Sequence, residues 1–350
     1  MRTQMCGRTA AAVGMALATL LAFGANAPFQ KSEGGNPKVA GGKYTLSGPY
    51  THGNLTIFLI HGEDQLKNKT FLTLQEALQQ KKVVVHETKQ VNQLAIENVS
   101  PNEEVFIQAG DIVKGGQQDR VIAFDLIVPA KSGRMPIASF CVEAGRWTRR
   151  GSESAANFDV SNNQAPTKGL KIAVRQQMAQ GKVWENVADA QRKLSANVGG
   201  SVQSPTSASS LQLTLENRKL QQTVNDYIKQ LQGISEGKND VIGFAFAVNG
   251  RVNSADVYAS HALFQKLWPA LLKGSAVEAL AELKKDGKFA PVAAPAVTSF
   301  LADADKGRAS EKKVTERVRL IQKESSKNIL FECRDREEES APVRRSYISK

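Results

Sequence analysis

Cysteine and histidine are scarce in this chain, whose 350 residues include three cysteines and four histidines. No histidine stands at metal-ligand spacing from another, so the sequence predicts no metal site. The Gly-x-Ser-x-Gly motif of serine hydrolases is missing, although residues 60–62 (Ile-His-Gly) resemble the oxyanion turn of those enzymes. Residues 41–43 (Gly-Gly-Lys) lack the spacing of a phosphate-binding loop, and no cofactor is expected.

No apolar run long enough to span a membrane follows the N-terminal region. Arg2 and Arg8 lie near the start of the chain, before a mainly apolar segment at residues 10–23. The small residues at 25–27 (Ala-Asn-Ala) follow this segment at the spacing of a signal-peptidase cleavage site. This order is typical of a secretory signal peptide, which we assign to residues 1–27. The apolar segment is shorter than the ~20 residues that cross a bilayer, which disfavours an anchoring helix. We therefore expect an exported protein, periplasmic or extracellular, with no membrane span after cleavage.

Two cysteines, Cys141 and Cys333, remain after the signal is removed. Disulfides persist in oxidising compartments, so a single bridge between them is one interpretation. The other is a buried and unreacted Cys141 that packs as a small apolar side chain. A cysteine nucleophile would need a histidine nearby, and the sequence places none there.

The charge balance favours anionic partners. Lys and Arg number 46 against 34 Asp and Glu, which gives a net charge of +12. No dense basic run with interleaved aromatic residues is present, so nucleic acid is not an expected partner. A hydrophobic content of 41% indicates a globular protein with a substantial core.

Glycine, proline and charge divide the chain into four parts. After the signal peptide, residues 28–43 form a flexible lead-in, residues 44–285 a single α+β domain, and residues 286–350 a charged linker with a C-terminal extension. The fold class that we predict is α+β, with a β-rich and mostly antiparallel N-terminal half packed against a helical C-terminal half.

Hydrophobic periodicity supports this division. Strands are predicted at residues 54–61, 83–87, 93–97, 104–107, 241–248 and 328–333, the fifth of them followed by the hairpin turn Asn249-Gly250. Helices are predicted at residues 73–80, 170–178, 183–194, 211–231, 255–273 and 314–322. Residues 199–210 are rich in serine and glycine and predict a mobile surface loop.

Two polar segments interrupt the apolar strands of the first half, at residues 106–120 and 139–147. We predict that residues 121–128 and 138–144 pair as a hairpin around a loop at 131–133. This pairing places Val121 opposite Glu143 and brings the polar segments together at one rim of the sheet. A clash between local patterns of this kind marks the most favourable place for a site.

Residues of both segments have chemistry suited to a site. Gly115 and Gly116 let backbone N–H groups approach an anion, and arginine supplies planar, two-pronged donors. The predicted ligand-binding residues are Lys114, Gly115, Gly116, Gln117, Arg120, Gly145, Arg146 and Trp147. Glu143 and Asp119 are predicted as a catalytic acid and base, because close carboxylates have separated pKa values. Alternatively, Arg120 and Arg146 pair with these carboxylates only to close the end of the sheet.

Three segments carry a resemblance to a known family. They are residues 114–120 (Lys-Gly-Gly-Gln-Gln-Asp-Arg), 141–147 (Cys-Val-Glu-Ala-Gly-Arg-Trp) and 250–258 (Gly-Arg-Val-Asn-Ser-Ala-Asp-Val-Tyr). Over residues 44–285 the chain resembles a bacterial domain family of unknown function, named for its association with ADP-ribosylglycohydrolase and rhodanese-phosphatase superfamily proteins. The resemblance implies a link to ADP-ribose or phosphate-related metabolism.

Three functions follow from these observations. The first is binding of a small anionic ligand, phosphate- or nucleotide-like, at residues 110–120 and 141–147. The second is hydrolysis by the Glu143 and Asp119 pair, in ADP-ribose-related metabolism. The third is an envelope interaction protein that uses the loop at residues 199–210.

Overall fold

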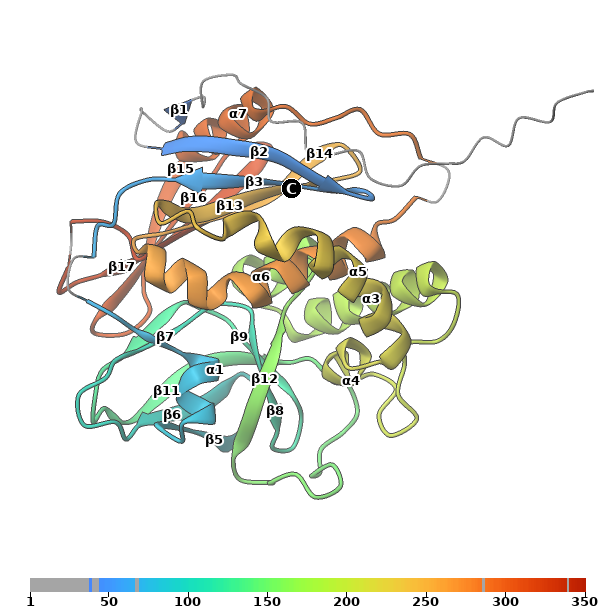
Figure 1. The fold of residues 1–350 in the computed structure, drawn as a ribbon. Helices are drawn as coiled ribbons and strands as arrows, with labels where there is room; N and C mark the ends of the chain where they lie inside the picture. Colours follow the sequence, from blue (N-terminus) through green and yellow to red (C-terminus); the bar gives the residue numbers. More distant parts are fainter. Residues whose placement is uncertain (1–37, 40–43, 67–68, 285–286, 339) are drawn as a thin grey trace, which may run out of the picture. The chain divides into compact units, whose positions relative to one another are not determined.

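The computed structural model describes residues 38–39, 44–66, 69–284, 287–338 and 340–350. The signal peptide assigned to residues 1–27 lies outside the described residues, and so does the expected lead-in at 28–43 apart from residues 38–39. The described chain forms three β-sheets with helices packed on them (Figure 1).

The largest sheet has nine strands, each antiparallel to its neighbours, in the order β1-β2-β3-β13-β14-β18-β17-β16-β15. Strands from the start of the chain therefore pair with strands from its last third. The nine strands are β1 (Lys38–Val39), β2 (Tyr44–His52), β3 (Leu55–His61), β13 (Val241–Val248), β14 (Arg251–Tyr258), β15 (Arg308–Lys313), β16 (Val318–Glu324), β17 (Asn328–Asp335) and β18 (Arg344–Ser349).

Two smaller sheets come from residues 72–164. The six-stranded sheet has the order β12-β8-β9-β11-β6-β5, and the three-stranded sheet has the order β10-β7-β4. The first contains β5 (Val83–Gln90), β6 (Gln93–Asn98), β8 (Asp111–Gly115), β9 (Arg120–Ile122), β11 (Gly133–Cys141) and β12 (Phe158–Gln164). The second contains β4 (Leu72–Thr73), β7 (Val105–Ile107) and β10 (Leu126–Val128).

Helices fill the space between the sheets. Figure 1 shows α5 and α6 between the nine-stranded sheet and the six-stranded sheet, with α7 on the other face of the large sheet. The helices are α1 (Leu74–Gln79), α2 (Lys168–Ile172), α3 (Gln180–Val198), α4 (Leu211–Leu215), α5 (Arg218–Leu231), α6 (His261–Ala281) and α7 (Ala294–Asp305), with a π-helix at Ala173–Gln177 and a 3₁₀ helix at Gln232–Ser235.

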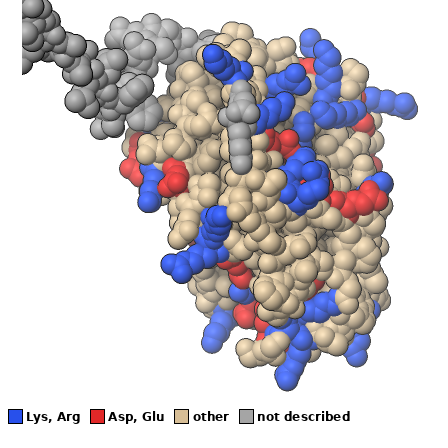
Figure 2. All heavy atoms as spheres, turned by 90° about the vertical axis from the view of Figure 1, so that its right-hand side faces the viewer, with Lys and Arg blue, Asp and Glu red and all other residues tan. Residues whose placement is uncertain are grey.

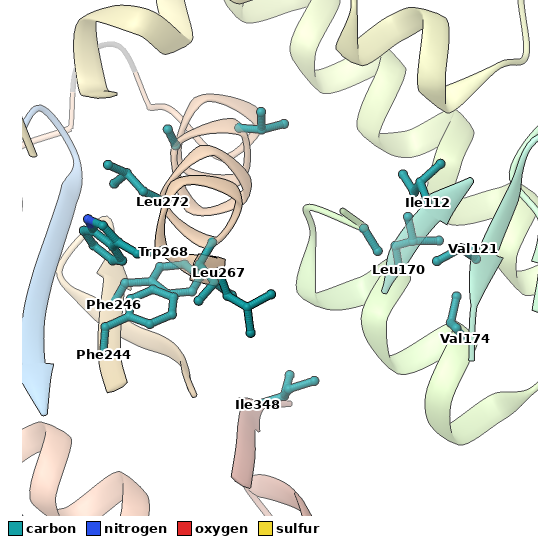
Figure 3. Packing of buried hydrophobic residues seen from close by; sticks show 14 of the residues in the cluster. Ile112, Val121, Leu170, Val174, Phe244, Phe246, Leu267, Trp268, Leu272 and Ile348 are labelled. Atoms are coloured by element: carbon teal, nitrogen blue, oxygen red, sulfur yellow. The ribbon is translucent and has the colours of Figure 1, made fainter. Parts of the chain in front are cut away.

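Strand β13 is buried along its whole length, because helices cover both faces of the sheet at this point. Side chains alternate between the two faces of a strand. Phe244 and Phe246 therefore face α6, where the rings of Phe244 and Trp268 have centroids 5.5 Å apart (Figure 3). Ala245 faces the opposite side and packs in the cluster that contains Phe300 of α7. Burial on both faces explains the continuous apolar sequence of this strand.

The predicted fold class is wrong, because the second half of the chain is not helical. Strands β13 to β18 all lie after residue 240, and they supply most of the nine-stranded sheet. The helix predicted at 314–322 is instead β16. The chain from β15 onward is highly charged, and charged residues on edge strands conceal the alternation that reveals a strand in a sequence.

Residues 286–350, expected as a linker and extension, form α7 and β15 to β18 in their described parts. Arg308–Lys313 is exposed at every position and forms one edge of the nine-stranded sheet. Lysines and an arginine on such an edge discourage pairing with another chain. Among the residues that the structure describes, none of the helices has the length and apolar character needed to cross a bilayer.

Candidate functional site

The two polar segments singled out in the sequence meet in the structure. The first turns between β8 and β9, and the second follows the end of β11. The backbone N–H of Val142 donates to the carbonyl oxygen of Asp119 at 3.0 Å. Gln118 Nε2 donates to the carbonyl oxygen of Glu143 at 2.6 Å. Residues 117–120 and 143–147 thus share one rim of the six-stranded sheet.

The strand pairing predicted between these segments is wrong by three residues. Val121 lies opposite Phe140, whereas the predicted hairpin would place it opposite Glu143. Asp119 consequently meets Val142 instead of a residue further along the second segment. Proximity of the segments was correctly expected, but the facing of individual side chains was not.

An interruption of the predicted strand at residues 123–125 explains the error in the pairing. The strand expected at 121–128 is two strands in two different sheets, since β9 ends at Ile122 and β10 starts at Leu126. Asp125 lies between the two strands and is 2% exposed. Its Oδ1 atom is 2.7 Å from Nη1 of Arg344. An ion pair with a residue far along the chain therefore overrides the local hairpin pattern.

Asp119 and Glu143 form the centre of a buried ionic cluster, and each is 0% exposed. Arg150 makes a two-pronged pair with the Asp119 carboxylate at 2.8 and 3.1 Å, and lies 3.5 Å from Glu143. Arg146 Nη2 lies 2.7 Å from Glu143 Oε2 and 3.7 Å from Asp119 Oδ1. Arg150 also lies 2.8 Å from Glu153, so two arginines serve three carboxylates. The alternative of a closed sheet end holds for Arg146 but not for Arg120, which pairs with Glu87.

Arg150 and Ser210 belong to this cluster but were missed in the sequence. Ser210 Oγ donates to Asp119 Oδ2 at 2.9 Å and also accepts from the N–H of Leu213 as the cap of α4. The capping role was readable, because a serine precedes the apolar run of α4. The bond to Asp119 was not readable, because no local pattern connects positions so far apart in the chain.

The carboxyl of Glu143 is ionised at neutral pH. Burial acts to raise its pKa, but hydrogen bonds from Arg146 and Ser207 outweigh burial and bring the pKa below its usual value. A catalytic acid needs a raised pKa in order to hold a proton near neutral pH. The acid and base roles of Glu143 and Asp119 stay a prediction, and the geometry favours an ion pair.

Arg120 is fully buried beside Trp147. Its Nη1 donates to the Val91 carbonyl oxygen at 2.6 Å and contacts Cys141 Sγ, and its Nη2 lies 3.5 Å from Glu87 Oε2. The Arg120 guanidinium is 5.7 Å from the centre of the Trp147 ring, and Trp147 itself is 45% exposed. Arg120 is 0% exposed, and its Nε and Nη2 atoms are buried without a hydrogen bond to the described residues.

Both cysteines among the described residues are free and buried, so no bridge joins Cys141 to Cys333. Burial raises the pKa of the Cys141 thiol to about 11, although the Arg120 guanidinium acts in the opposite direction. A thiol with this pKa is protonated at neutral pH and is a poor nucleophile. The interpretation of Cys141 as a buried, unreacted side chain is confirmed.

The glycines of the first segment fit tightly against the protein itself. Gly115 and Gly116 have φ values of 113° and 53°, which side chains rarely adopt. A Cβ on Gly116 would lie 2.4 Å from the Phe158 ring, and the N–H of Gly115 donates to Asp119 Oδ1 at 3.0 Å. Gly145, with φ of 81°, faces open space instead. An anion at Gly115 would therefore have to displace the Asp119 carboxylate.

A second candidate place lies away from this cluster, in a groove of about 710 Å³ lined by residues of α1, α5 and α6. Most of its polar lining consists of side-chain amides, from Gln75, Gln79, Asn162, Gln221, Asn225, Gln232 and Gln265. Two lysines of α6, Lys266 and Lys273, and two carboxylates, Glu76 and Glu236, also line it. Among the described residues, no three His, Cys, Asp or Glu side chains gather in a way that could hold a metal ion.

Lys273 differs from the other lysine of the groove. Lys266 donates to the Phe71 carbonyl oxygen at 2.8 Å and lies 3.2 Å from Glu76 Oε2. Lys273 makes no hydrogen bond or ion pair within the described part of the chain, and it is partly buried. Burial lowers the pKa of its ammonium group, and the more distant Glu216 offsets this effect only in part.

Lys114, a predicted ligand-binding residue, is connected to this groove through Glu216. Lys114 Nζ lies 3.2 Å from Glu216 Oε1, and Gln212 donates to the same oxygen at 2.8 Å. Glu216 is thus shared between a lysine and an amide, and it also acts on the charge of Lys273 at longer range. The polar segment at 114–120 therefore affects the electrostatics of the groove.

A buried carboxyl lies behind the amide wall. Gln75 Nε2 donates to Asp111 Oδ1 at 3.3 Å, and Gln164 Nε2 donates to the same atom at 2.9 Å. Burial raises the pKa of Asp111 to about 6, although these hydrogen bonds act to lower it. The Asp111 carboxyl holds Gln75 in place at the edge of the groove.

Comparison with known proteins identifies the family. A family model, described as the ARG and Rhodanese-Phosphatase-superfamily-associated Protein domain, matches residues 43–339. The chain belongs to this family. No curated protein and no solved structure matches the chain. The match confirms the resemblance seen in the sequence and extends past residue 285 into β15, β16 and β17.

In this ARG and Rhodanese-Phosphatase-superfamily-associated Protein domain, the segments that carried the resemblance are mainly interior. Residues 114–120 and 141–147 build the Asp119 and Glu143 cluster. Residues 250–258 are β14 and the turn before it, and they include Asp256, whose Oδ1 lies 2.8 Å from Nη2 of Arg344. These segments therefore supply buried polar contacts, at one rim of the six-stranded sheet and, through Asp256 and Arg344, between the large sheet and Asp125.

Replacing Glu143 by Gln should cost about 2 kcal/mol of stability at pH 7, because the charged hydrogen bond from Arg146 is lost. The folded pKa of Glu143 is depressed, so its contribution is present above the unfolded pKa and is lost as the pH falls through the folded pKa. Urea unfolding at pH 7 and pH 3 measures this. Glu185→Gln, whose ion pair with Lys182 is exposed on both sides, is the control. A deficit that is equally large at both pH values would contradict the assignment.

Proposed function

We propose that this protein is a binding protein for an anionic organic ligand with hydroxyl groups, of the sugar phosphate or nucleotide class, held in the groove between α1, α5 and α6. The observation that carries the proposal is Lys273, a partly buried lysine that makes no hydrogen bond or ion pair to the described residues, in the lining of this groove of about 710 Å³. The class of ligand, a phosphate- or nucleotide-like anion, is the one that the sequence favours. The proposed site is different, because the sequence placed it at residues 110–120 and 141–147.

The charge of the ligand follows from Lys273. An ammonium group that has lost part of its hydration without gaining a partner is unfavourable, and the lowered pKa expresses this cost. A phosphate or carboxylate beside Lys273 Nζ would supply the missing counter-charge. By contrast, Arg146 and Arg150 at the other candidate place already hold two buried carboxylates. The uncompensated lysine is therefore the better place for an anion.

The remaining chemistry of the ligand follows from the amides. Each side-chain amide offers both donors and an acceptor, which suits hydroxyl groups and ring nitrogens. The groove volume of about 710 Å³ lies within the range of small-molecule sites. Figure 2 shows Lys and Arg side chains spread over one face of the molecule with Asp and Glu among them. A defined groove accounts for selective anion binding better than such a dispersed surface charge.

Calorimetric titration of the purified domain with ADP-ribose, AMP and ribose 5-phosphate tests the proposal, with ribose as the neutral comparison. At least one phosphorylated probe should bind more tightly than ribose, and Lys273→Met should weaken that binding about ten-fold or more. Lys306→Met, an equal charge change at an exposed position next to α7, should leave it unchanged. The proposal fails if no phosphorylated probe binds, or if Lys273→Met binds like the wild type.

Lys273→Met should also raise the melting temperature at pH 7, by about 2 °C, because the partner-free cation costs stability. The lysine pKa is lower in the folded state than in the unfolded state. The cost is therefore fully present below the folded pKa, and it disappears as the pH rises towards the ordinary lysine value of about 10.4. Thermal unfolding at pH 7 and pH 10.5 shows whether the gain shrinks. A lower melting temperature at pH 7 would mean that Lys273 has a stabilising partner.

A further inference from the structure

We propose that a second cavity, lined by Tyr44, Lys323, Arg334 and Arg345, binds the phosphate group of an inorganic phosphate or phosphate monoester. The cavity has a volume of about 210 Å³ and lies on the nine-stranded sheet, at residues of β2, β16, β17 and β18. It does not include Lys273, so it is independent of the groove proposed above.

The pleat of the sheet brings the cationic side chains together. Glu332 lies directly opposite Arg345, and Arg334 follows two positions later on the same face of β17. Lys323 pairs with Leu330, two positions before Glu332, so it shares this face as well. Leu330 packs in the cluster beneath α7. Beyond that apolar cluster, the same face of the sheet carries the charged side chains named above.

Positive charge exceeds negative charge in the lining of the cavity. Arg334 Nη2 lies 2.9 Å from Glu332 Oε2, and Arg345 Nη2 lies 3.1 Å from Glu332 Oε1. Lys323 Nζ lies 3.6 Å from Glu332 Oε1. Three cations thus share one carboxylate that is 2% exposed, and outside the lining Arg345 has a second partner in Asp305 at 2.6 Å. One positive charge remains uncompensated after both carboxylates are counted.

Several donors at the cavity lack a partner. Tyr44 is 6% exposed, and its hydroxyl makes no hydrogen bond to the described residues. Arg334 and Arg345 use Nε and Nη2 for their carboxylates, and the Nη1 atom of each makes no hydrogen bond within the described part of the chain. A phenol hydroxyl that lines the same cavity as two guanidinium groups is an arrangement that an oxyanion would complete.

The number of donors favours a phosphate group. A carboxylate has two oxygens, whereas a phosphate offers three or four, enough to accept from Tyr44, Arg334, Arg345 and Lys323 together. Glu332 lies among the cations and fixes their side chains, so the site needs little reorganisation when the anion arrives. The cavity admits a phosphate with room for water or for the first atoms of a monoester.

Isothermal titration with inorganic phosphate, in a phosphate-free buffer at constant ionic strength set by chloride, tests this site. Tyr44→Phe removes only the hydroxyl and should weaken phosphate binding about ten-fold without lowering the melting temperature in chloride. Arg334→Met should weaken it at least as much. Lys306→Met should bind phosphate like the wild type.

Two further measurements distinguish inorganic phosphate from a phosphate monoester as the ligand, and the second cavity from the groove. Ribose 5-phosphate titrated into Lys273→Met reports on the second cavity alone, and tighter binding than inorganic phosphate identifies a monoester as the ligand. Weaker binding identifies free phosphate. The proposal is overturned if phosphate binds no better than chloride, or if Tyr44→Phe and Arg334→Met both bind phosphate like the wild type. Failure of the groove proposal would instead appear as unchanged binding of every probe in Lys273→Met.

Discussion

Replacing Arg344 by Met should destabilise the protein by about 4 kcal/mol, the largest effect expected for a single side chain here. Arg344 is 4% exposed and lies 2.7 Å from Asp125 and 2.8 Å from Asp256, which are 2% and 5% exposed. Methionine fills a similar volume but leaves both carboxylates buried next to an apolar side chain. Arg175, 3.5 Å from Asp125, would compensate only one of them. Urea unfolding followed by circular dichroism measures the loss.

The position of Arg344 in the fold explains why the effect should be global. Arg344 begins β18 of the nine-stranded sheet, Asp256 belongs to the neighbouring β14, and Asp125 lies between β9 and β10 of the smaller sheets. The ion pairs therefore link the large sheet to the two small ones. Asp125 has a pKa below its usual value because Arg344 and Arg175 outweigh the effect of burial. Acid should weaken the same link as the pH falls through that pKa.

Two variants show whether buried charge is the cause. Arg134→Met changes an exposed arginine that lies 3.6 Å from Glu97, and it should cost less than 1 kcal/mol. Arg344→Met combined with Asp256→Asn should recover part of the loss, because one uncompensated carboxylate is removed. A cost below about 1 kcal/mol for Arg344→Met, similar to that of Arg134→Met, would show that the cluster is not important for stability.

Apolar pattern made much of the fold predictable. The strand expected at 241–248 is β13 with the same bounds, the turn Asn249-Gly250 follows it, and the strand expected at 54–61 is β3. These segments bury continuous apolar runs, and burial is what a hydrophobic pattern records. The strand β15 gave no such signal, because most of its residues are charged and it is an exposed edge. In β16 the apolar residues Val318, Leu320 and Ile321 also fit a helical spacing, so the pattern predicted the wrong element.

The candidate sites were predictable only where residues lie near one another in the sequence. Asp119 and Glu143 were expected together because a reversal of the chain lies between them. Arg150 and Lys273 were not expected, because the first lies in a loop and the second lies on a helix whose apolar pattern says nothing about cavities. The absence of a partner for a lysine is a property of three-dimensional packing, so no pattern in the sequence could reveal it.

Replacing Arg150 by Met should destabilise the protein by about 3 kcal/mol. Its two-pronged pair with Asp119 at 2.8 and 3.1 Å would be lost, and Arg146 at 3.7 Å would be the nearest remaining cation. Ser210 also binds Asp119, so the start of α4 should loosen, and with it the position of Glu216 beside the groove. Hydrogen exchange of the α4 amides and urea unfolding measure these two effects separately.

Arg149 provides a control next to Arg150 in the chain, because it is exposed. Arg149→Met should unfold at the same urea concentration as the wild type, within about 0.5 kcal/mol. Arg150→Lys should recover part of the stability, since it keeps the charge but cannot reproduce the planar fork that meets both Asp119 oxygens. Arg150→Met combined with Asp119→Asn should be more stable than Arg150→Met alone, because a buried carboxylate without a strong partner costs more than a neutral amide. If Arg149→Met and Arg150→Met were equally stable, the carboxylates at the rim of the six-stranded sheet would be accessible to water, and the cluster would be open to an external cation or ligand after all.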